Sequence, residues 1–244
     1  MQSISAAGLL NIWENGLDLT PNERALELLA AGDLAIPKEE IAKFPIGHRD
    51  GRLLTLREQI FGPDITALAN CPKCNKFLET QLGVSDIRIT QDPNLPKNFW
   101  VQVQNYRVSF RLPDSRDLIA IAEVSDPLDS KELLIRNCIL QVWQDEVEKT
   151  NKQIPGEVLD AVIKKMDESD PQANIQLNLI CPACGYTWQE QFDILRYFWS
   201  EIDNWATHTL EEVHILATAY GWRESDILSM SARRRQIYME KVVE

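Results

Sequence analysis

The sequence lacks both a long hydrophobic run and an excess of positive charge. None of its 244 residues belong to a stretch of the roughly 20 apolar residues that a membrane-spanning helix requires. Lys and Arg number 25 against 37 Asp and Glu, so the formal net charge is −12. Nucleic-acid backbones select for basic protein surfaces. We therefore expect neither direct membrane insertion nor nucleic-acid binding.

Motifs of the common enzyme classes are absent too. There is no glycine-rich nucleotide-binding loop and no Gly-x-Ser-x-Gly nucleophile motif. The three histidines, His48, His208 and His214, have no partner at metal-ligand spacing, and the last two are six residues apart, which places them on different faces of a helix. No set of nucleophile, base and orienting residue is visible. The sequence therefore predicts a protein that is not an enzyme.

Flexible linkers and a secretion signal are also missing. Glycine and proline together contribute only 22 residues, and the N-terminus has no basic segment before Glu14 and Asp18. We expect no signal peptide and hence a reducing, cytoplasmic environment. In such an environment disulfides among the five cysteines are not expected, and metal binding by some of them is favoured.

Four of the cysteines form two matching motifs. Residues Cys71–Asn75 and Cys181–Gly185 both read Cys-Pro-x-Cys followed by Asn or Gly. The two-residue gap lets both sulfurs reach one ion, and the residue after each pair tolerates the left-handed conformation that closes the turn. A closed structural zinc site needs four ligands. We therefore predict one structural Zn²⁺ held by Cys71, Cys74, Cys181 and Cys184.

Other interpretations of these cysteines are a redox pair and ordinary buried thiols. Redox Cys-x-x-Cys motifs start a helix after a buried strand, whereas alternating, strand-like sequence follows both motifs here. A zinc enzyme requires an open coordination position, which four cysteines do not leave. The fifth cysteine, Cys138, stands among Ile135, Ile139 and Leu140 and is expected to be a small core residue.

Apolar residues recur at helical spacing near both ends of the sequence. Thr20 and Glu23 match a capping box, and Gly32 is placed to end that helix in a left-handed conformation. From residue 192 onward the sequence is expected to be helical. There Thr209 and Glu212 match a second capping box, which predicts that a new helix begins at that point. Gly221 is expected to end it and Ser231 to cap the last helix.

The middle of the sequence mixes strand and helix patterns. Residues 99–112 predict a hairpin with its turn at Gln104 and Asn105. The remaining predicted elements are a helix at 51–61, a strand at 77–84, a helix capped by Asp114 or Ser115 that runs through Val124, helices near 130–147 and 155–167, and a strand from Ile175 into Cys181.

These patterns predict an α+β fold built around the metal site. Mostly helical N- and C-terminal parts, residues 1–66 and 193–244, flank a split four-cysteine zinc ribbon of residues 67–84 plus 175–192. Residues 85–174 form an inserted α+β module. Such an insertion costs little loop-closure entropy, because that cost grows only logarithmically with length. We expect the strands beside the two motifs to pair with each other.

Three blocks of the sequence carry a family resemblance, namely Glu23–Ala30, Pro45–Asp50 with Leu56–Pro63, and the stretch from the second cysteine motif to Tyr238. They resemble the baseplate proteins and baseplate hub-assembly proteins of T-even-type phages, whose relatives occur in phage-tail-like contractile injection systems. Tyr220-Gly221-Trp222 and the Arg-rich helix after it carry the most specific likeness, and we identify no family that residues 85–175 resemble.

The resemblance implies a non-enzymatic baseplate component or assembly chaperone whose partners are other baseplate, spike or hub proteins. It also implies a location in the cytoplasm or in the assembled particle. The expected partner-binding residues are Trp222, Arg233, Arg234, Arg235 and Tyr238. For the three arginines, a solvated helix start and, less in keeping with the net charge, nucleic-acid contact are the other interpretations. The alternative function is a zinc-ribbon regulator that binds nucleic acid.

Overall fold

In a computed structural model the chain forms two compact units, residues 1–34 with 194–244 and residues 35–193. The structure describes residues 4–90, 95–122, 126–150 and 154–243. Helices and small antiparallel sheets make an α+β protein, as the sequence predicts. In the described part of the chain, no helix is both long and apolar enough to cross a membrane. The four-part division predicted above stays a prediction.

The first unit is helical and is organised around one long helix. Its elements are α1 (Ala6–Gly16), α2 (Pro21–Gly32), α9 (Ile194–Tyr220), α10 (Glu224–Leu228) and α11 (Ala232–Val243). Helix α9 contacts each of the other four. The core of this unit is formed mainly by side chains of α9 and α10, together with one from α1. These residues are Leu10, Ala206, Val213, Leu216, Ile227 and Leu228.

Local signals explain where most of these helices begin and end. Thr20 and Glu23 form the predicted capping box, in which the Thr20 N–H donates to Glu23 Oε2 over 2.9 Å. Gly221 has a φ of +67° directly after α9, and the Arg234 N–H donates to Ser231 Oγ at the start of α11. Gly32, in contrast, is the last residue of α2, and the cap is Asp33 with a φ of −141°. The prediction of a left-handed glycine cap there is wrong.

Helix α9 also corrects the prediction that a new helix begins at Thr209. The helix is continuous over its 27 residues, because no glycine or proline interrupts it and buried positions recur every three to four residues. Thr209 is one of these buried positions, with only 2% of its surface exposed. Glu212 does not cap a helix but accepts a hydrogen bond from the Arg235 guanidinium over 2.7 Å.

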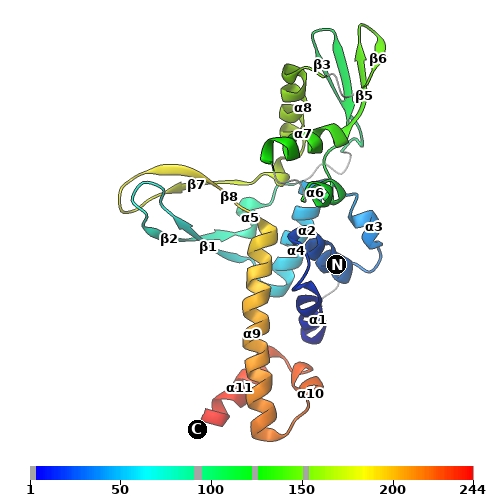
Figure 1. Cartoon of the computed structure of the whole chain (residues 1–244). Coiled ribbons are helices and arrows are strands. Elements are labelled where there is room, and N and C mark those ends of the chain that lie inside the picture. Colours follow the sequence, from blue (N-terminus) through cyan, green and yellow to red (C-terminus); the bar gives the residue numbers. More distant parts are fainter. Residues whose placement is uncertain (1–3, 91–94, 123–125, 151–153, 244) are drawn as a thin grey trace. The chain divides into compact units, whose positions relative to one another are not determined.

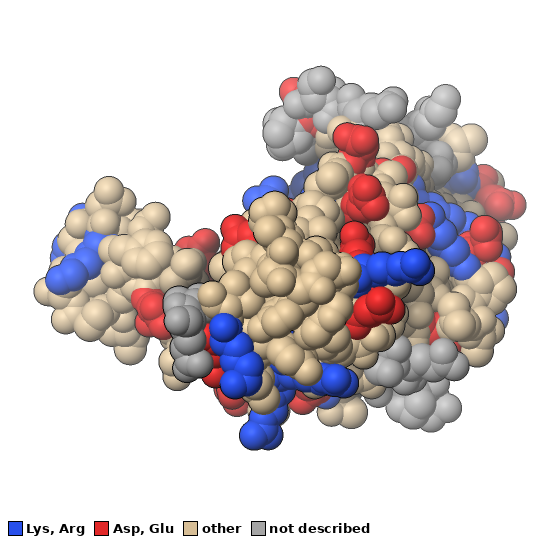
Figure 2. Space-filling model, turned by 90° about the horizontal axis from the view of Figure 1, so that it is seen from below, with Lys and Arg blue, Asp and Glu red and all other residues tan. Residues whose placement is uncertain are grey.

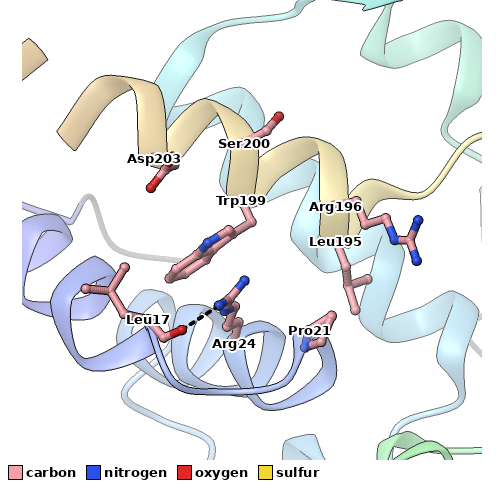
Figure 3. A pocket seen from close by; sticks show the side chains of 8 residues that line it. All are labelled: Leu17, Pro21, Arg24, Leu195, Arg196, Trp199, Ser200 and Asp203. Carbon is pink, nitrogen blue, oxygen red and sulfur yellow. Dashed lines mark hydrogen bonds between the residues drawn. The ribbon is translucent and has the colours of Figure 1, made fainter. Parts of the chain in front are cut away.

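Trp199, near the start of α9, packs against the segment that connects α1 and α2 (Figure 3). The Arg24 guanidinium lies 4.4 Å from the centre of the Trp199 ring and donates to the carbonyl oxygens of Gly16 and Leu17 over 2.7 and 2.9 Å. Arg24 thereby satisfies carbonyls at the end of α1 that have no partner inside the helix. A Cβ atom on Gly16 would lie 2.3 Å from the Trp199 ring, so only glycine fits this contact.

All strands of the described residues lie in the second unit. Its helices are α3 (Lys38–Ile41), α4 (Ile46–Phe61), α5 (Val84–Ile87), α6 (Ser115–Ile121), α7 (Pro127–Cys138) and α8 (Gly156–Ser169), with a 3₁₀ turn η2 (Pro171–Ala173). Strands β3 (Phe99–Val103), β4 (Tyr106–Phe110), β5 (Ile139–Gln144) and β6 (Val147–Lys149) form one antiparallel sheet in that order. Two further hairpins are β1 (Asp64–Asn70) with β2 (Phe77–Gly83) and β7 (Gln176–Ile180) with β8 (Thr187–Gln191).

Helices α7 and α8 cover one face of the four-stranded sheet (Figure 1). The buried residues between them include Val108, Phe110, Val142, Val162 and Cys138, so the expectation that Cys138 is a core residue is confirmed. The hairpin predicted at 99–112 is present, and its turn residue Gln104 has a φ of +52°.

The helix predicted near 130–147 is only half correct. Helix α7 ends at Cys138, and β5 begins at the next residue. Val142 lies opposite Val108 in the sheet and is almost fully buried, so strand pairing overrides the helical spacing of the apolar residues. The helix capped by Asp114 is present as far as Ile121, and its predicted end at Val124 lies outside the described residues.

Helix α4 packs against η2 through a glycine. The Gly47 N–H donates to Asp170 Oδ2 over 2.8 Å, and a Cβ atom on Gly47 would meet Asp170 Oδ1 at 1.9 Å and the Ala173 nitrogen at 2.9 Å. Only a residue without a side chain allows the helix to approach this closely.

We therefore expect Gly47→Ala to destabilise the protein by about 1–3 kcal/mol, as overpacking does. The matched control is Gly51→Ala, one turn later in α4, where a Cβ atom meets nothing closer than Gln172 Cγ at 3.9 Å. That change should be neutral or stabilising by up to about 1 kcal/mol, because alanine is the better helix former. Urea unfolding of both variants measures the difference, and equal effects would contradict this account of the α4–η2 contact.

Candidate metal centre

Each cysteine motif forms the tip of its own hairpin. The Cys71 N–H donates to the Lys76 carbonyl over 2.9 Å, and the Cys181 N–H donates to the Tyr186 carbonyl over 2.8 Å. Asn75 and Gly185 have φ values of +56° and +69°, as expected for the residues that close these turns. The two tips therefore have the same local structure.

The strands beside the motifs do not pair in the way the sequence suggests. Strand β2 pairs with β1, and β7 pairs with β8. Within the described residues no ladder joins the two hairpins. The reason is that each Cys-x-x-Cys turn itself connects two neighbouring strands. A single zinc ribbon with one continuous sheet is therefore not confirmed, and the two halves meet at their tips (Figure 1).

At those tips the four sulfurs converge. Cys71 Sγ lies 3.7 Å from Cys184 Sγ, and Cys74 Sγ lies 3.6 Å from Cys181 Sγ. All four sulfurs lie within 4.8 Å of one another. A tetrahedral metal with metal–sulfur distances of about 2.3 Å separates its ligands by about 3.8 Å, whereas a disulfide needs about 2.05 Å. The arrangement fits four thiolates around one metal ion.

The electrostatics of the cluster favour a bound cation. Burial is the largest influence on the Cys181 thiol and raises its pKa, but the N–H groups of Ala183 and Cys184 and the neighbouring thiols together lower that pKa to about 6. For Cys74, the Lys76 N–H lowers the pKa, but burial and the other three thiols outweigh it and raise the pKa to about 12. Four close sulfurs cannot all ionise without a compensating positive charge.

No second cluster of this kind exists among the described residues, since the four cysteines are the only group of three or more His, Cys, Asp or Glu side chains with ligand atoms close enough for a metal. His48 stacks on Phe44 with ring centres 4.5 Å apart. His208 lies 3.6 Å from Glu211 on the surface of α9.

The residues expected to bind a partner lie at the C-terminal end of the first unit. Tyr220, Trp222 and Tyr238 form an aromatic cluster with ring centres 4.5 to 5.8 Å apart. Arg233 and Arg234 are exposed, and Figure 2 shows Lys and Arg side chains gathered along one side of an uncharged area.

Arg235 differs from the other two arginines. Only 3% of its surface is exposed, and its guanidinium donates to Glu212 Oε2 over 2.7 Å and to the Met230 carbonyl over 3.0 Å. It therefore joins α11 to α9 and does not offer a surface charge, contrary to the expectation from sequence.

The second unit also contains a buried charged cluster that the sequence does not predict. Arg49 is 2% exposed and donates to Asp50 Oδ1 over 2.8 Å and to Ser115 Oγ over 3.2 Å. Burial raises the pKa of Asp50 to about 6, against the attraction of Arg49, and burial also raises the pKa of Asp170. The residues Arg49 and Asp50 stand in one of the family-like blocks, but their charge predicts exposure, so the sequence has no signal for their burial.

A comparison with families of known proteins matches residues 30–199 to the family described as T4 bacteriophage base plate protein. The match includes residues 85–175, for which no resemblance was expected from the sequence, and it ends before Tyr220-Gly221-Trp222, the part of the sequence with the most specific likeness to the family. It therefore spans the whole of the second unit, including the cysteine cluster. No curated protein and no solved structure matches the chain.

Proposed function

This chain belongs to the family of T4 bacteriophage base plate proteins, and we propose that it is a non-enzymatic component or assembly factor of the baseplate of a contractile phage tail or phage-tail-like injection system. The family match over residues 30–199 carries this proposal. A baseplate component works by contacts with other particle proteins, and the net charge of −12 argues against the alternative of a regulator that binds nucleic acid.

We assign the cysteine cluster a structural Zn²⁺ held by Cys71, Cys74, Cys181 and Cys184. Four cysteine ligands are typical of structural zinc sites, and they leave no open position for catalysis. The ion would join two hairpins whose cysteine pairs lie more than a hundred residues apart in the sequence. Its role is to supply folding free energy to this part of the chain.

The surface proposed to bind other baseplate, spike or hub proteins lies on the first unit. It comprises Trp222, Arg233, Arg234 and Tyr238 and leaves out the buried Arg235. Tryptophan, tyrosine and arginine are the residue types that most often dominate the binding energy of protein interfaces. The two exposed arginines suit a partner with an acidic face.

Deletion of the gene is expected to prevent formation of complete baseplates, so that sheathed tails or injection particles fail to assemble. Electron microscopy of the particles and their infectivity or injection activity measure this effect. Quantitative mass spectrometry of particles purified from the wild type then separates the two roles, because a component is present at a fixed ratio to hub proteins and a transient factor is not. Normal particles from the deletion strain would refute the proposal.

The surface on the first unit is tested by complementing the deletion with the double charge reversal Arg233→Glu and Arg234→Glu. We expect this variant to restore few particles. The matched control reverses Lys164 and Lys165, two exposed residues of α8, and should complement fully. Full complementation by both variants would exclude the arginines from the interface.

A further inference from the structure

The two cysteine-bearing hairpins expose large apolar side chains close to their tips. Leu68 and Phe77 on the first hairpin are each 61% exposed, and Ile180 on the second is 68% exposed. Tyr186, in the second tip itself, is also exposed. Single exposed apolar side chains are ordinary on a protein surface, but a group of them marks a surface that something else covers.

These apolar side chains lie on both outer sides of the hairpin pair. In the ladder of β1 and β2, Leu68 and Phe77 are diagonal neighbours and share one face. The alternate positions of both hairpins are half-buried, namely Ala67, Ala69, Leu78, Leu177, Leu179 and Trp188. Because the two tips converge on the four sulfurs (Figure 1), the half-buried sides face the other hairpin. Leu68, Phe77 and Ile180 therefore point outward, the first two on one side and Ile180 on the other.

The tips carry positive but no negative side chains. Residues 65–78 and 171–189 contain no Asp or Glu, and their only charged residues are Lys73 and Lys76, both of which are exposed. Lys73 Nζ lies 5.9 Å from the centre of the Tyr186 ring on the other tip. Four thiolates around a zinc ion form a negative centre, which the two lysines offset. The outer surface of the tips thus presents apolar side chains and ammonium groups without a carboxylate, in a chain whose net charge is −12.

The position of the apolar side chains limits how deeply the tips can enter another medium. Leu68 lies three residues before Cys71, and Phe77 lies three residues after Cys74. A strand rises by about 3.3 Å per residue, so both side chains stand roughly 10 Å from the cysteine turn. Apolar faces that rest in the headgroup region of a membrane enter by about 5–10 Å. Contact of this depth requires no spanning segment.

A layer of anionic lipid matches this surface better than a protein or a nucleic acid does. A single protein surface would cover one side of the tips, whereas lipid encloses both sides at once. A nucleic acid would leave the outward apolar side chains in water. Lysine stems lie against apolar groups while their ammonium groups reach phosphates, and tyrosine and tryptophan favour the boundary between lipid and water. Tyr186 and Trp188 stack here with ring centres 6.4 Å apart.

We propose that the paired hairpin tips bind the surface of a membrane that contains anionic lipids. Leu68, Phe77 and Ile180 enter the headgroup region from both sides of the tips, and Lys73 and Lys76 contact lipid phosphates. Each lysine near an anionic leaflet contributes to the attraction, and salt weakens that contribution. The inference goes beyond the role in the baseplate and does not rest on it, because the surface is built from the two tips alone.

The test is flotation of the full-length protein, purified with zinc in the buffer, with vesicles of phosphatidylcholine and with vesicles of an equal mixture of phosphatidylcholine and phosphatidylglycerol. We expect the protein to float with the mixed vesicles, to bind them more weakly at high salt, and to bind phosphatidylcholine vesicles least. Hydrogen exchange locates the contact without any mutation, because the mixed vesicles should protect residues 68–78 and 180–188 and leave residues 99–110 unchanged. Absence of flotation with both kinds of vesicle, or protection only outside the tips, would overturn the proposal.

Apolar variants assign the binding to the tips. Phe77→Ser should weaken binding to the mixed vesicles at least tenfold, because a large apolar side chain no longer leaves water. The control Val147→Ser removes an apolar side chain of β6 that is 58% exposed but lies outside the tips, and it should bind normally. Both variants are compared at full zinc content, so that loss of the metal cannot account for a difference.

Charge variants test the lysines in the same assay. The double change Lys73→Gln and Lys76→Gln should weaken binding to the mixed vesicles about tenfold or more and remove the preference over phosphatidylcholine. The same changes at Lys164 and Lys165, two exposed residues of α8, should have no effect. If vesicles leave the tips unprotected while another baseplate protein protects them, the tips are a protein interface and the proposal is wrong.

Discussion

Replacement of Cys181 by serine is expected to abolish metal binding and to unfold both cysteine-bearing hairpins, while the four-stranded sheet remains folded. Cys181 is buried and lies 3.6 Å from Cys74 Sγ, so its loss removes one ligand and leaves three thiols without a closed shell. An isolated two-stranded hairpin is at best marginally stable. Zinc binding in small structural sites contributes about 10–16 kcal/mol of folding free energy at pH 7. An isolated hairpin has far less folding free energy of its own.

Two measurements check this expectation. Metal analysis of the purified protein should find about one zinc ion per chain in the wild type and almost none in the variant. Hydrogen exchange should show lost protection in residues 64–83 and 176–191 but retained protection in residues 99–110. Removal of the metal from the wild-type protein with a chelator should reproduce the exchange pattern of the variant.

The matched control is Cys138→Ala. Cys138 is fully buried in the core beneath the four-stranded sheet and belongs to no metal cluster, so this change should destabilise that core without loss of zinc. A Cys181→Ser protein that keeps a full equivalent of zinc would overturn the four-cysteine assignment. A wild-type protein without zinc whose hairpins remain protected would overturn the structural role of the ion.

The second large effect is expected for Arg49→Met. Methionine preserves much of the apolar length of the side chain but removes a buried cation that donates to Asp50 and Ser115. Removal of one partner of a buried ion pair typically costs about 3–5 kcal/mol, because the other charge stays buried without compensation. We expect a loss of this size at neutral pH.

The loss should depend on pH in a defined direction. The pKa of Asp50 in the folded protein is raised to about 6, above the value of about 3.9 for an unfolded chain. The folded state therefore holds the proton more tightly, and the stability contributed by neutral Asp50 is fully present below about pH 4 and disappears as the pH rises through the folded pKa. Without Arg49 the pKa of Asp50 rises further. The difference in the free energy of unfolding between variant and wild type should therefore be smaller at pH 5 than at pH 8.

Denaturant unfolding at both pH values measures this difference. The control is Lys43→Met, which removes a cation from an exposed ion pair with Glu40 and should cost at most about 1 kcal/mol. If Arg49→Met is no more destabilising than Lys43→Met at pH 8, the buried cluster does not contribute to stability in the way its geometry indicates.

Local signals predicted those elements whose ends depend on neighbouring residues alone. The capping box of Thr20 and Glu23, the cap at Ser231 and the glycine stop at Gly221 are each satisfied within a few residues, and all three are present. The hairpin at 99–112 likewise follows from alternation and a short turn. Such features need no knowledge of the rest of the chain.

Predictions failed where distant residues decide the conformation. Thr209 matches a helix cap in sequence but lies on the buried side of one continuous helix. Residues 139–144 have helical spacing but pair with β4, because the sheet offers partners that a helix pattern cannot reveal. The charge of Arg235 predicts exposure, but its side chain is buried, because Glu212 lies near enough to accept a hydrogen bond from its guanidinium.

The sequence by itself determined that two Cys-Pro-x-Cys turns exist and that each can present two sulfurs, since that depends only on spacing and backbone freedom. The tertiary structure alone decided that the two turns meet, with all four sulfurs within 4.8 Å, and that each turn belongs to its own hairpin. These outcomes depend on contacts between residues far apart in the chain, and local spacing carries no information about which distant partners a strand or a side chain will find.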